Sequence, residues 1–414
     1  MSDAASPGSE EVVHDVQQTG CVVVGGGPAG VVLSLLLARK NIAVTLLEAH
    51  KDFDRDFRGD TVHPSTLEIL DQLGLADRLL QIPHGELRQM RATTPSGTLT
   101  MLSFAGLKTR FPFVAVMPQS KFLDFLIEEA KKFPNFRLEL GANVQRLVRE
   151  DGAVKGVRYR GADAAWHEVR APLTVGADGR FSKLRSLAGF EPVKSAPPMD
   201  VLWFRLPRKP EDKEAEGEFY IHGGRFAVAF QRPDEWQVGY VITKGNFAHV
   251  KAEGIEALRK GLVELVPWIG DRVEQLQDWK QIVVLSVESS RLPCWHQPGL
   301  LLIGDAAHVM SPVGGVGINY AIQDAVETAN MLAAPLKEGK VTDAQLAAVQ
   351  KVREWPVKVI QKVQGLIQEQ IVKSALAGTF KMPWIVRAIG AIPLVRTLPG
   401  RLIGFGIRRV RVEM

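Results

Sequence analysis

Residues 21–51 read CVVVGGGPAGVVLSLLLARKNIAVTLLEAHK. The first letters, CVVVG, form a short β-branched run, which is typical of a parallel strand buried on both faces. We expect a helix over AGVVLSLLLARK, with Asn41 as its end, and a second strand over IAVTLL that ends at Glu48. This strand–helix–strand order predicts the opening unit of a Rossmann-like α/β fold.

Three glycines of this stretch occupy the GxGxxG positions. Gly25 permits the tight turn from strand to helix, Gly27 lets a phosphate approach the backbone, and Gly30 lets the helix pack closely on the strand. Pro28 and Ala29 lie where the helix begins, a place that tolerates the missing N–H of proline. The glycines predict a dinucleotide-binding turn, with an ordinary structural turn as the alternative.

An acidic residue closes the second strand. Glu48, followed by Ala49, lies where a carboxylate can accept hydrogen bonds from ribose hydroxyls. The same negative charge would repel a 2′-phosphate. The resident dinucleotide is therefore expected to be FAD or NAD and not NADP.

Two distant stretches favour FAD over NAD. Residues 173–185, LTVGADGRFSKLR, place Asp178 after an apolar strand. Residues 299–332, GLLLIGDAAHVMSPVGGVGINYAIQDAVETANML, place Gly304 and Asp305 after another strand. An aspartate there can bind a ribityl hydroxyl, and a glycine-rich loop lets backbone N–H groups approach the isoalloxazine edge. Each stretch alone would also fit an ordinary strand–loop–helix, but the three together in this order indicate FAD.

The long helix after this loop is expected to begin near Gly317, with Ile318 and Asn319 in its first turn. A helix N-terminus directs a positive dipole end toward its ligand. Reduced flavin can be an anion across N1–C2=O, so this end would stabilise it. An NAD-dependent dehydrogenase has no need of such an element.

The three motifs GGGPAG, GADGRFSKLR and LIGDAAHVMSP resemble those of the para-hydroxybenzoate hydroxylase-like class A flavoprotein monooxygenases, over about residues 20–345. The resemblance implies FAD contacts from Arg58, in DRDFRGDTVHPSTLEILDQLGL, and from Gln119, in MPQSKFLDFL. The family loop is often Gly-Gln-Gly, whereas the chain has Gly315-Val316-Gly317. Backbone contacts to FAD should survive this departure, and Asn319 is retained.

The same resemblance implies a discontinuous architecture. We expect a Rossmann-like FAD-binding domain over 20–75, 116–189 and 286–345 and an inserted antiparallel-sheet substrate domain over 76–115 and 190–285. Residues 346–414 are expected to form C-terminal helices. Aromatic and histidine side chains of the inserted sheet are the candidates for the substrate cavity: Trp203, Tyr220, His222, Phe226 and Tyr240.

The implied reaction is hydroxylation of an aromatic or polyketide-like small molecule, with O2 and with NADPH or NADH as transient reductant, through a flavin C4a-hydroperoxide. No catalytic side chain is identifiable. Pro312 and Gly315 are candidates because the family loop lies beside C4a, and His222 is a candidate titratable group. His308 is expected mainly to stabilise the loop.

A halogenase or reductase on the same fold, including alkene reduction or epoxidation, is the alternative, although no WxWxIP segment is found. A non-catalytic FAD-binding module is a third reading.

No second glycine fingerprint exists for the nicotinamide nucleotide. Arg180 and Arg185, near the second motif, are candidates for contacts with it, with solvated surface charge as the alternative. The sequence does not distinguish NADPH from NADH.

Composition excludes several other classes. The net charge of +5 is spread along the chain, which argues against nucleic-acid binding. Two cysteines and no zinc spacing favour a reducing cytoplasm and no metal. No apolar run predicts a membrane span. The first 20 residues lack a signal-peptide pattern and are expected to be a flexible lead-in.

The C-terminal segment 346–414 combines apolar helical spacing with arginines. One interpretation is helices that pack on the FAD domain or on a second subunit of a homodimer. The other is a basic amphipathic surface with weak, peripheral membrane contact.

Overall fold

The computed structural model describes residues 13–53, 60–212, 217–380, 395 and 397–413. Its central sheet has the strand order β21-β22-β13-β2-β3-β9, parallel except for the edge strand β21. The bounds are β2 Cys21–Val24, β3 Val44–Glu48, β9 Phe136–Leu140, β13 Leu173–Gly176, β21 His296–Gln297 and β22 Leu300–Leu302. Every residue of β2, β3, β13 and β22 is buried, as the apolar runs predict.

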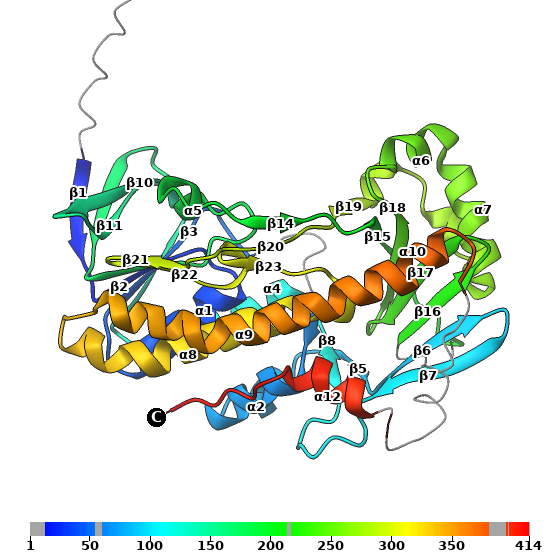
Figure 1. The fold of residues 1–414 in the computed structure, drawn as a ribbon, viewed down its shortest axis with the longest axis horizontal. Coiled ribbons are helices and arrows are strands. Elements are labelled where there is room, and N and C mark those ends of the chain that lie inside the picture. Colours follow the sequence, from blue (N-terminus) through cyan, green and yellow to red (C-terminus); the bar gives the residue numbers. More distant parts are fainter. Residues whose placement is uncertain (1–12, 54–59, 213–216, 381–394, 396, 414) are drawn as a thin grey trace, which may run out of the picture.

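Helices cover one face of this sheet (Figure 1). α1 (Pro28–Arg39) packs between α4 (Gln119–Lys131) and α8 (Gly317–Lys337). Asn41 has a φ of 59°, so the chain leaves α1 through a left-handed residue at the predicted end. The predicted FAD-type α/β fold is thus confirmed, including the long helix that begins at Gly317.

A four-stranded sheet, ordered β1-β12-β11-β10, lies against β13. Its strands are β1 Val13–Gln18, β10 Asn143–Glu150, β11 Ala153–Arg160 and β12 Trp166–Arg170. The expectation of a flexible lead-in up to residue 20 is wrong for Val13–Gln18, which pairs in parallel with β12. Its alternate residues are half-buried and exposed, so a polar composition suits an edge strand with only one inward side.

The second large sheet has seven strands in the order β19-β15-β18-β17-β16-β6-β7 and is antiparallel except for the β6–β16 pair. It comprises β6 Gln89–Thr94, β7 Gly97–Ser103, β15 Met199–Pro207, β16 Gly217–His222, β17 Arg225–Gln231, β18 Glu235–Thr243 and β19 Val283–Ser286. One face is covered by α7 (Ile255–Leu265), with α6 (Phe247–Glu253) beside it. The inserted antiparallel sheet that the family resemblance implies is therefore present.

Two small sheets join the large ones: β4 Thr61–Val62, β5 Gly85–Leu87 and β8 Val114–Val116 in one, and β14 Val193–Ser195, β20 Ser289–Arg291 and β23 His308–Val309 in the other. Further α-helices are α2 Pro64–Gln72, α3 Ala76–Leu79 and α5 Lys183–Leu187. Single 3-10 turns occupy Pro267–Ile269, Val273–Gln275, Trp279–Gln281, Gly304–Ala306 and Val313–Gly315.

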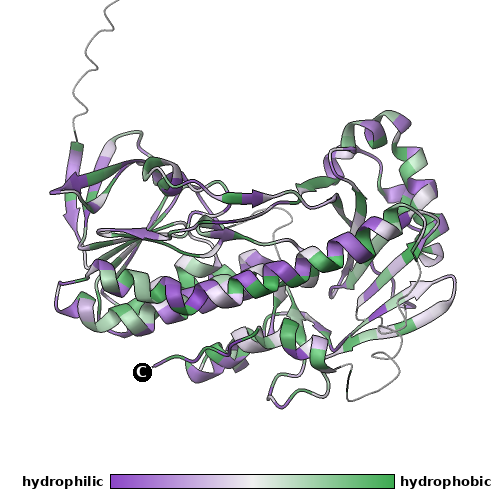
Figure 2. Cartoon of the chain, viewed as in Figure 1, coloured by the Kyte–Doolittle hydropathy of each residue, from purple (hydrophilic) through white to green (hydrophobic). Residues whose placement is uncertain are grey.

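The C-terminal helices connect the two halves of the molecule (Figure 1). α9 (Asp343–Ile367) packs on α8 and continues through a π-helical turn, Gln368–Val372, into α10 (Lys373–Leu376), which reaches β17. Figure 2 shows that α9 alternates between hydrophobic and hydrophilic residues. α12 (Thr397–Phe405) lies against α2 and β7. Residues 381–394 and 396, part of the predicted amphipathic segment, lie outside the described residues. Within the described residues, no helix is long and apolar enough to span a membrane.

Candidate active site

The glycine turn after β2 is tight at its ends and open in its middle. Gly25 has a φ of 105°, and a Cβ added there would lie 2.4 Å from the carbonyl oxygen of Ala177. A Cβ on Gly30 would lie 1.9 Å from the carbonyl oxygen of Gly25. A Cβ on Gly27 would meet no atom within 4 Å. The turn therefore offers room for a phosphate at Gly27, beside Pro28 in the first turn of α1.

Glu48 closes β3 beside this turn. Its carboxylate accepts hydrogen bonds from the backbone N–H of Gly26 at 2.7 Å and from that of His50 at 2.9 Å. The side chain is buried, whereas the neighbouring Ala49 is exposed and lines a cavity of about 370 Å³. The acid is thus held at the edge where a ribose would lie against the glycine turn.

The Glu48→Ala substitution is expected to weaken FAD affinity by about 10-fold or more, because a charge-assisted hydrogen bond is lost. The Kd of FAD for the deflavinated protein checks this, by fluorescence quenching. Glu139→Ala, on the neighbouring strand β9, is a matched control that should leave the Kd unchanged. An unchanged Kd for Glu48→Ala would contradict the ribose assignment.

The two other predicted aspartates have different surroundings. Asp178 accepts hydrogen bonds from Ser182 Oγ at 2.6 Å and from the backbone N–H of Leu184 at 3.0 Å, so it caps α5. Burial raises the pKa of Asp178 above its ordinary value. Asp305 is half-buried in the turn Gly304–Ala306 that follows β22. Of these two aspartates, Asp305 is therefore the one that lies close to the glycine-rich loop in the sequence and is not used to cap a helix.

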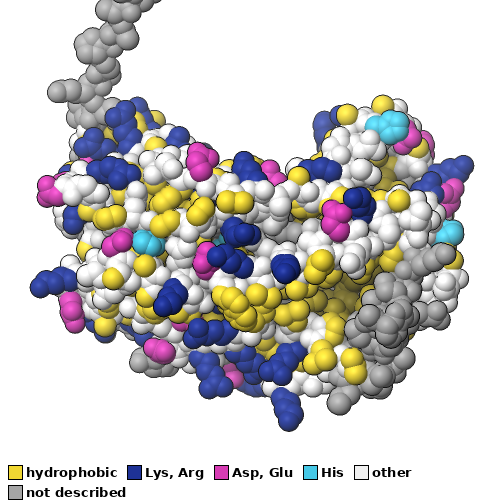
Figure 3. Space-filling view, in the orientation of Figure 1, with side chains coloured by type: hydrophobic (Ala, Val, Ile, Leu, Met, Phe, Trp, Pro, Cys, Tyr) yellow, Lys and Arg dark blue, Asp and Glu magenta, His cyan; other side chains and the backbone are white. Residues whose placement is uncertain are grey.

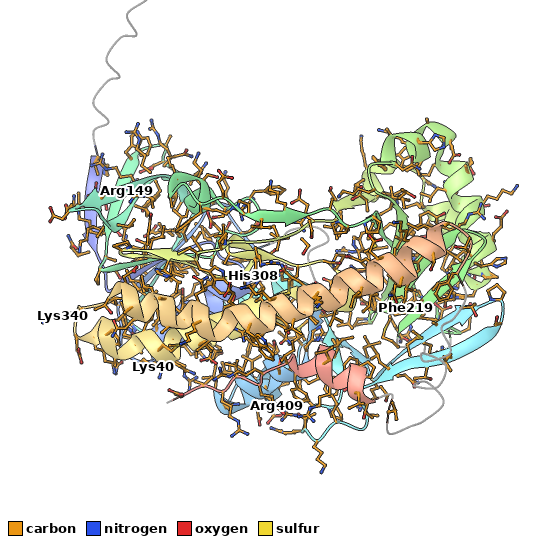
Figure 4. All side chains as sticks on the ribbon, in the orientation of Figure 1. Lys40, Arg149, Phe219, His308, Lys340 and Arg409 are labelled. Carbon is orange, nitrogen blue, oxygen red and sulfur yellow. The ribbon has the colours of Figure 1, made fainter. Side chains whose placement is uncertain are left out.

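A buried cluster of charged side chains fixes this turn. The carboxylate of Asp324, on α8, contacts His308 Nε2 at 2.6 Å and Arg353 Nε at 2.7 Å, and it accepts from the backbone N–H of Gly304 at 3.0 Å. Burial alone would raise the pKa of Asp324, but His308 and Arg353 hold it below its ordinary value. Figure 4 shows His308 between the central strands and α9. Asp324 and Arg353 were missed by sequence reasoning, although charged residues on otherwise apolar helix faces are a signal.

The loop after His308 is held by three glutamines of α9 and the π-helical turn. Gln361 Nε2 donates to the carbonyl oxygens of Ser290 and Val309 at 2.9 and 3.0 Å. Gln364 Nε2 donates to those of Ser311 and Val313 at 2.9 and 2.8 Å. Gln368 donates to Ser311 Oγ. All three glutamines are buried, so the C-terminal helix sets the position of Pro312 and its neighbours.

The loop then turns into α8. Gly314 and Gly315 have φ values of 81° and 63°, and Gly317 has open space around it. Asn319 is fully buried, and its Oδ1 accepts from Ser65 Oγ and from Thr66 Oγ1. Those contacts orient the amide, and its Nδ2 has no hydrogen-bond partner within the described part of the chain.

His63 lies on the other side of the same loop. Its Nδ1 is 3.0 Å from the carbonyl oxygen of Ile403 on α12, so a neutral ring donates there and keeps a lone pair on Nε2. Nε2 is buried with no hydrogen-bond partner among the described residues, and a Cβ on Gly315 would lie 3.6 Å from it. Burial lowers the pKa of His63 to about 4. The ring is therefore neutral near pH 7.

The low pKa of His63 predicts a loss of stability in acid. The unfolded chain binds a proton at His63 below about pH 6.5, and the folded chain only near pH 4, so stability falls as pH decreases through this window. The expected contribution is up to about 3 kcal/mol. Urea unfolding of the wild type and His63→Gln from pH 7.5 to 4.5 measures it.

In that series, His63→Gln should show a shallower pH dependence than the wild type. His249→Gln, at an exposed histidine of α6, is the control that should keep the wild-type slope. Equal slopes for the wild type and His63→Gln would contradict the assignment.

The segment that precedes His63 contacts the inserted sheet. Asp60 forms an ion pair with Arg232 at 2.9 Å, and the backbone N–H of Gln119, at the start of α4, also faces its carboxyl group. Burial raises the pKa of Asp60 to about 6. Gln119 is half-buried beside this group, and the predicted Arg58 lies outside the described residues.

The structure divides the five predicted cavity residues. Trp203 and Phe226 lie on the sheet face that also contacts Val313 of the loop. Tyr220 and Tyr240 lie on the opposite face, against α7, and Tyr220 accepts a hydrogen bond from Trp268. His222 is exposed at the end of β16, where the hairpin turns, so it is not brought beside Pro312 or Gly315. Phe219, labelled in Figure 4, was missed and belongs to the loop-facing group.

These residues fit FAD. There is open space at Gly27 and Gly317, and Asn319 Nδ2 and His63 Nε2 lie without partners among the described residues near the N-terminus of α8 and its preceding loop. A polar atom buried without a partner costs free energy, so such atoms indicate a place for a polar ligand. A donor amide, an acceptor ring nitrogen and helix N–H groups match the mixed polar edge of an isoalloxazine.

Comparison with known proteins agrees with this geometry. A family model described as an FAD binding domain matches residues 18–362. A 6-methylpretetramide 4-monooxygenase from Streptomyces rimosus is 31% identical over 403 residues, which cover 96% of this chain and 95% of the relative.

Solved structures agree in fold. A p-nitrophenol 4-monooxygenase from Pseudomonas putida DLL-E4 is 20% identical with a TM-score of 0.78, covering 95% of this chain and 100% of the other. An anhydrotetracycline hydroxylase from Streptomyces rimosus is 21% identical with a TM-score of 0.73, covering 96% and 78%. By the match to the FAD binding domain and by the similarity along nearly its whole length, the chain belongs to the FAD-dependent class A flavoprotein monooxygenases.

Proposed function

We propose that the protein hydroxylates a flat, largely apolar aromatic molecule of the polyketide type, with FAD, O2 and NAD(P)H. One observation carries the proposal: the glycine loop Val313–Gly315 faces an aromatic wall formed by Trp203, Phe219 and Phe226. Such a wall binds planar apolar rings by burial and by stacking. The name of the Streptomyces relative, whose substrate is a pretetramide, supports the same class.

FAD would be held by the predicted contacts that the structure describes: Gly25, Gly27, Pro28, Ala29, Gly30, Glu48, Ala49, Gln119, Asp178, Gly304, Asp305, Pro312, Gly315, Val316, Gly317, Ile318 and Asn319. When bound and reduced, FAD would activate O2, from which one oxygen atom is transferred to the substrate. Asn319 Nδ2 and the α8 N-terminus would stabilise negative charge at the flavin edge. His63 Nε2 would accept one hydrogen bond from the bound group.

The protein's other task is to orient the substrate and exclude water. The apolar group around Trp203 and Phe226 is continuous with Val372 and Ala375 of the C-terminal helices, which close that side. The wall formed by Trp203, Phe219 and Phe226 carries no titratable base, so it would orient the substrate and not act as a general base. Trp203 and Phe226 remain the proposed substrate contacts from the predicted set.

We also propose that the chain is organised into three parts. The division into an FAD-binding domain, an inserted substrate domain and the C-terminal helical segment 346–414 is supported by the two large sheets. Exposed apolar side chains at Leu366 and Leu398 are compatible with a homodimer or with weak lipid contact. Size-exclusion chromatography with light scattering, and sedimentation with anionic liposomes, separate these two. A cytoplasmic location rests on the sequence.

The test is a turnover assay with purified, FAD-loaded protein. NADPH and NADH oxidation are followed across phenols, naphthacene-type polyketides and quinones, with product mass as the second readout. The proposal expects substrate-stimulated NAD(P)H oxidation and a product one oxygen atom heavier. A product that gains two hydrogens would indicate a reductase, and one that gains halogen in the presence of halide would indicate a halogenase.

A further inference from the structure

A basic groove separate from the FAD edge lies between α9 and the strands β14 and β20. It has a volume of about 400 Å³. Its lining includes Lys194, Arg291, Lys358 and Lys362, together with three serines, and contains no acidic residue. Lysine and arginine side chains are visible on the face that α9 presents in Figure 3. The chemistry of such a lining matches phosphate groups.

Most of the lysine and arginine side chains that line this groove have no acidic partner within the described residues. Lys358 pairs with Glu354 at 2.8 Å. Within the described residues, Lys194, Arg291 and Lys362 have no ion pair. Three uncompensated positive charges around one hollow would attract a polyanion strongly at low ionic strength.

An exposed aromatic side chain stands beside the groove. Trp355 is 58% exposed on α9. It precedes Lys358 by three residues and Lys362 by seven, so all three project from one side of the helix. An aromatic surface next to phosphate-binding cations is the arrangement that a nucleotide uses, because its base can stack while its phosphates are neutralised.

The groove adjoins the flavin loop. Gln361 lines it and also donates to the carbonyl oxygen of Val309, at the start of the loop. The sequence analysis gave Arg185 as a candidate contact for the nicotinamide nucleotide. Its guanidinium is instead engaged within the protein, because it donates to the carbonyl oxygens of Arg180 and Ala306 at 2.6 and 3.2 Å. The groove is therefore a cationic hollow one strand away from the site where a reductant must act.

We propose that this groove binds the adenosine-phosphate half of the nicotinamide dinucleotide, with Trp355 against the adenine and Lys194, Arg291 and Lys362 on the phosphates. The proposal rests on the proposed function, since it supplies the docking site for its reductant. It adds no covalent step: hydride passes from the nicotinamide to the flavin, and the oxidised nucleotide leaves. Three cations also predict tighter binding of the 2′-phosphorylated nucleotide than of the unphosphorylated one.

The experiment is calorimetric titration of NADP⁺ and of NAD⁺ into the FAD-loaded protein. The triple variant K194Q/R291Q/K362Q removes the charges and keeps polar side chains, and its Kd for NADP⁺ should rise about 100-fold or more. Trp355→Ala should raise it about 10-fold. Lys340→Gln removes one charge from the turn between α8 and α9, at the far end of α9 in Figure 4, and should leave the Kd unchanged. In the wild type, added salt should weaken NADP⁺ binding more than NAD⁺ binding.

The outcomes separate this inference from the proposed function. If the triple variant binds NADP⁺ as tightly as the wild type, or if the wild type binds neither nucleotide, the groove assignment is overturned. If NADP⁺ binds as predicted but neither NADPH nor NADH reduces the flavin on anaerobic mixing in the presence of the substrate panel, the groove stands and the proposed function fails. If the triple variant instead loses only sedimentation with phosphatidylglycerol vesicles, the groove belongs to a lipid surface and the assignment is overturned.

Discussion

Replacing Asp324 by alanine is expected to lower the free energy of unfolding by about 3–5 kcal/mol, because it leaves a buried arginine without its carboxylate. Arg353 and His308 are both fully buried against this carboxylate, and the backbone N–H of Gly304 loses its acceptor as well. The turn that carries Asp305 would relax, so FAD content of the purified protein should fall too. Urea unfolding and the absorbance ratio of flavin to protein measure the two effects.

Two further variants test the same cluster even if Asp324→Ala fails to fold. Arg353→Met retains the volume of the side chain and leaves Asp324 with His308 and Gly304, so a smaller loss of about 2–3 kcal/mol is expected. Glu338→Ala, an exposed carboxylate at the end of α8, should change stability by less than about 0.5 kcal/mol. If Asp324→Ala and Glu338→Ala were equally stable, the cluster would not support the loop.

The Gly27→Val substitution is expected to abolish FAD retention in a protein that still folds. Gly27 has a φ of −77° and open space where a Cβ would stand, so the apoprotein accepts the side chain. The valine would occupy the space through which a phosphate reaches the backbone N–H groups of α1. Loss of two charge-assisted hydrogen bonds weakens binding by about 100-fold or more.

Matched glycine variants separate this effect from unfolding. Gly365→Val adds the same side chain to α9, where a Cβ also meets no atom within 4 Å, and should leave the FAD Kd unchanged. Gly30→Val should prevent folding, because its Cβ would collide with the carbonyl oxygen of Gly25. If Gly27→Val bound FAD with wild-type affinity, the phosphate could not lie at this turn.

Local patterns were sufficient to predict the FAD-type fold. The β-branched run at β2, the glycine turn and the end of α1 at Asn41 each depend on a few neighbouring residues, and all three appear where expected. Val13–Gln18 was not predicted as a strand because it is polar and half-buried, and its partner β12 lies about 150 residues away in the chain. Pairing over that separation leaves no mark in a local window.

The substrate wall was predicted only in part, for a reason of strand geometry. Side chains alternate between the two faces of a strand, so one residue of register decides which face is lined. Tyr220 and Phe219 are neighbours in β16, yet Tyr220 packs under α7 and Phe219 faces the loop. The sequence shows the aromatic residues but not the face to which each belongs.

The support of the flavin loop could not be predicted because it is long-range. Gln361 and Gln364 donate to carbonyl groups, and Gln368 donates to the Ser311 hydroxyl, in each case of residues more than 50 positions earlier. Their spacing of three and four residues on one helix face is a usable signal in retrospect, since a buried polar stripe needs partners. A sequence alone does not say which partners those are.

Monooxygenase activity is tested most directly by mass spectrometry of the hydroxylated product formed under isotopically labelled O2, in ordinary water, with FAD-loaded enzyme and NAD(P)H. One labelled oxygen atom is expected in each product molecule, and the product should carry no label when the same reaction is run with ordinary O2 in labelled water. A product that carries no label from O2, or that takes its oxygen from water, would contradict assignment of the protein as a flavin-dependent monooxygenase.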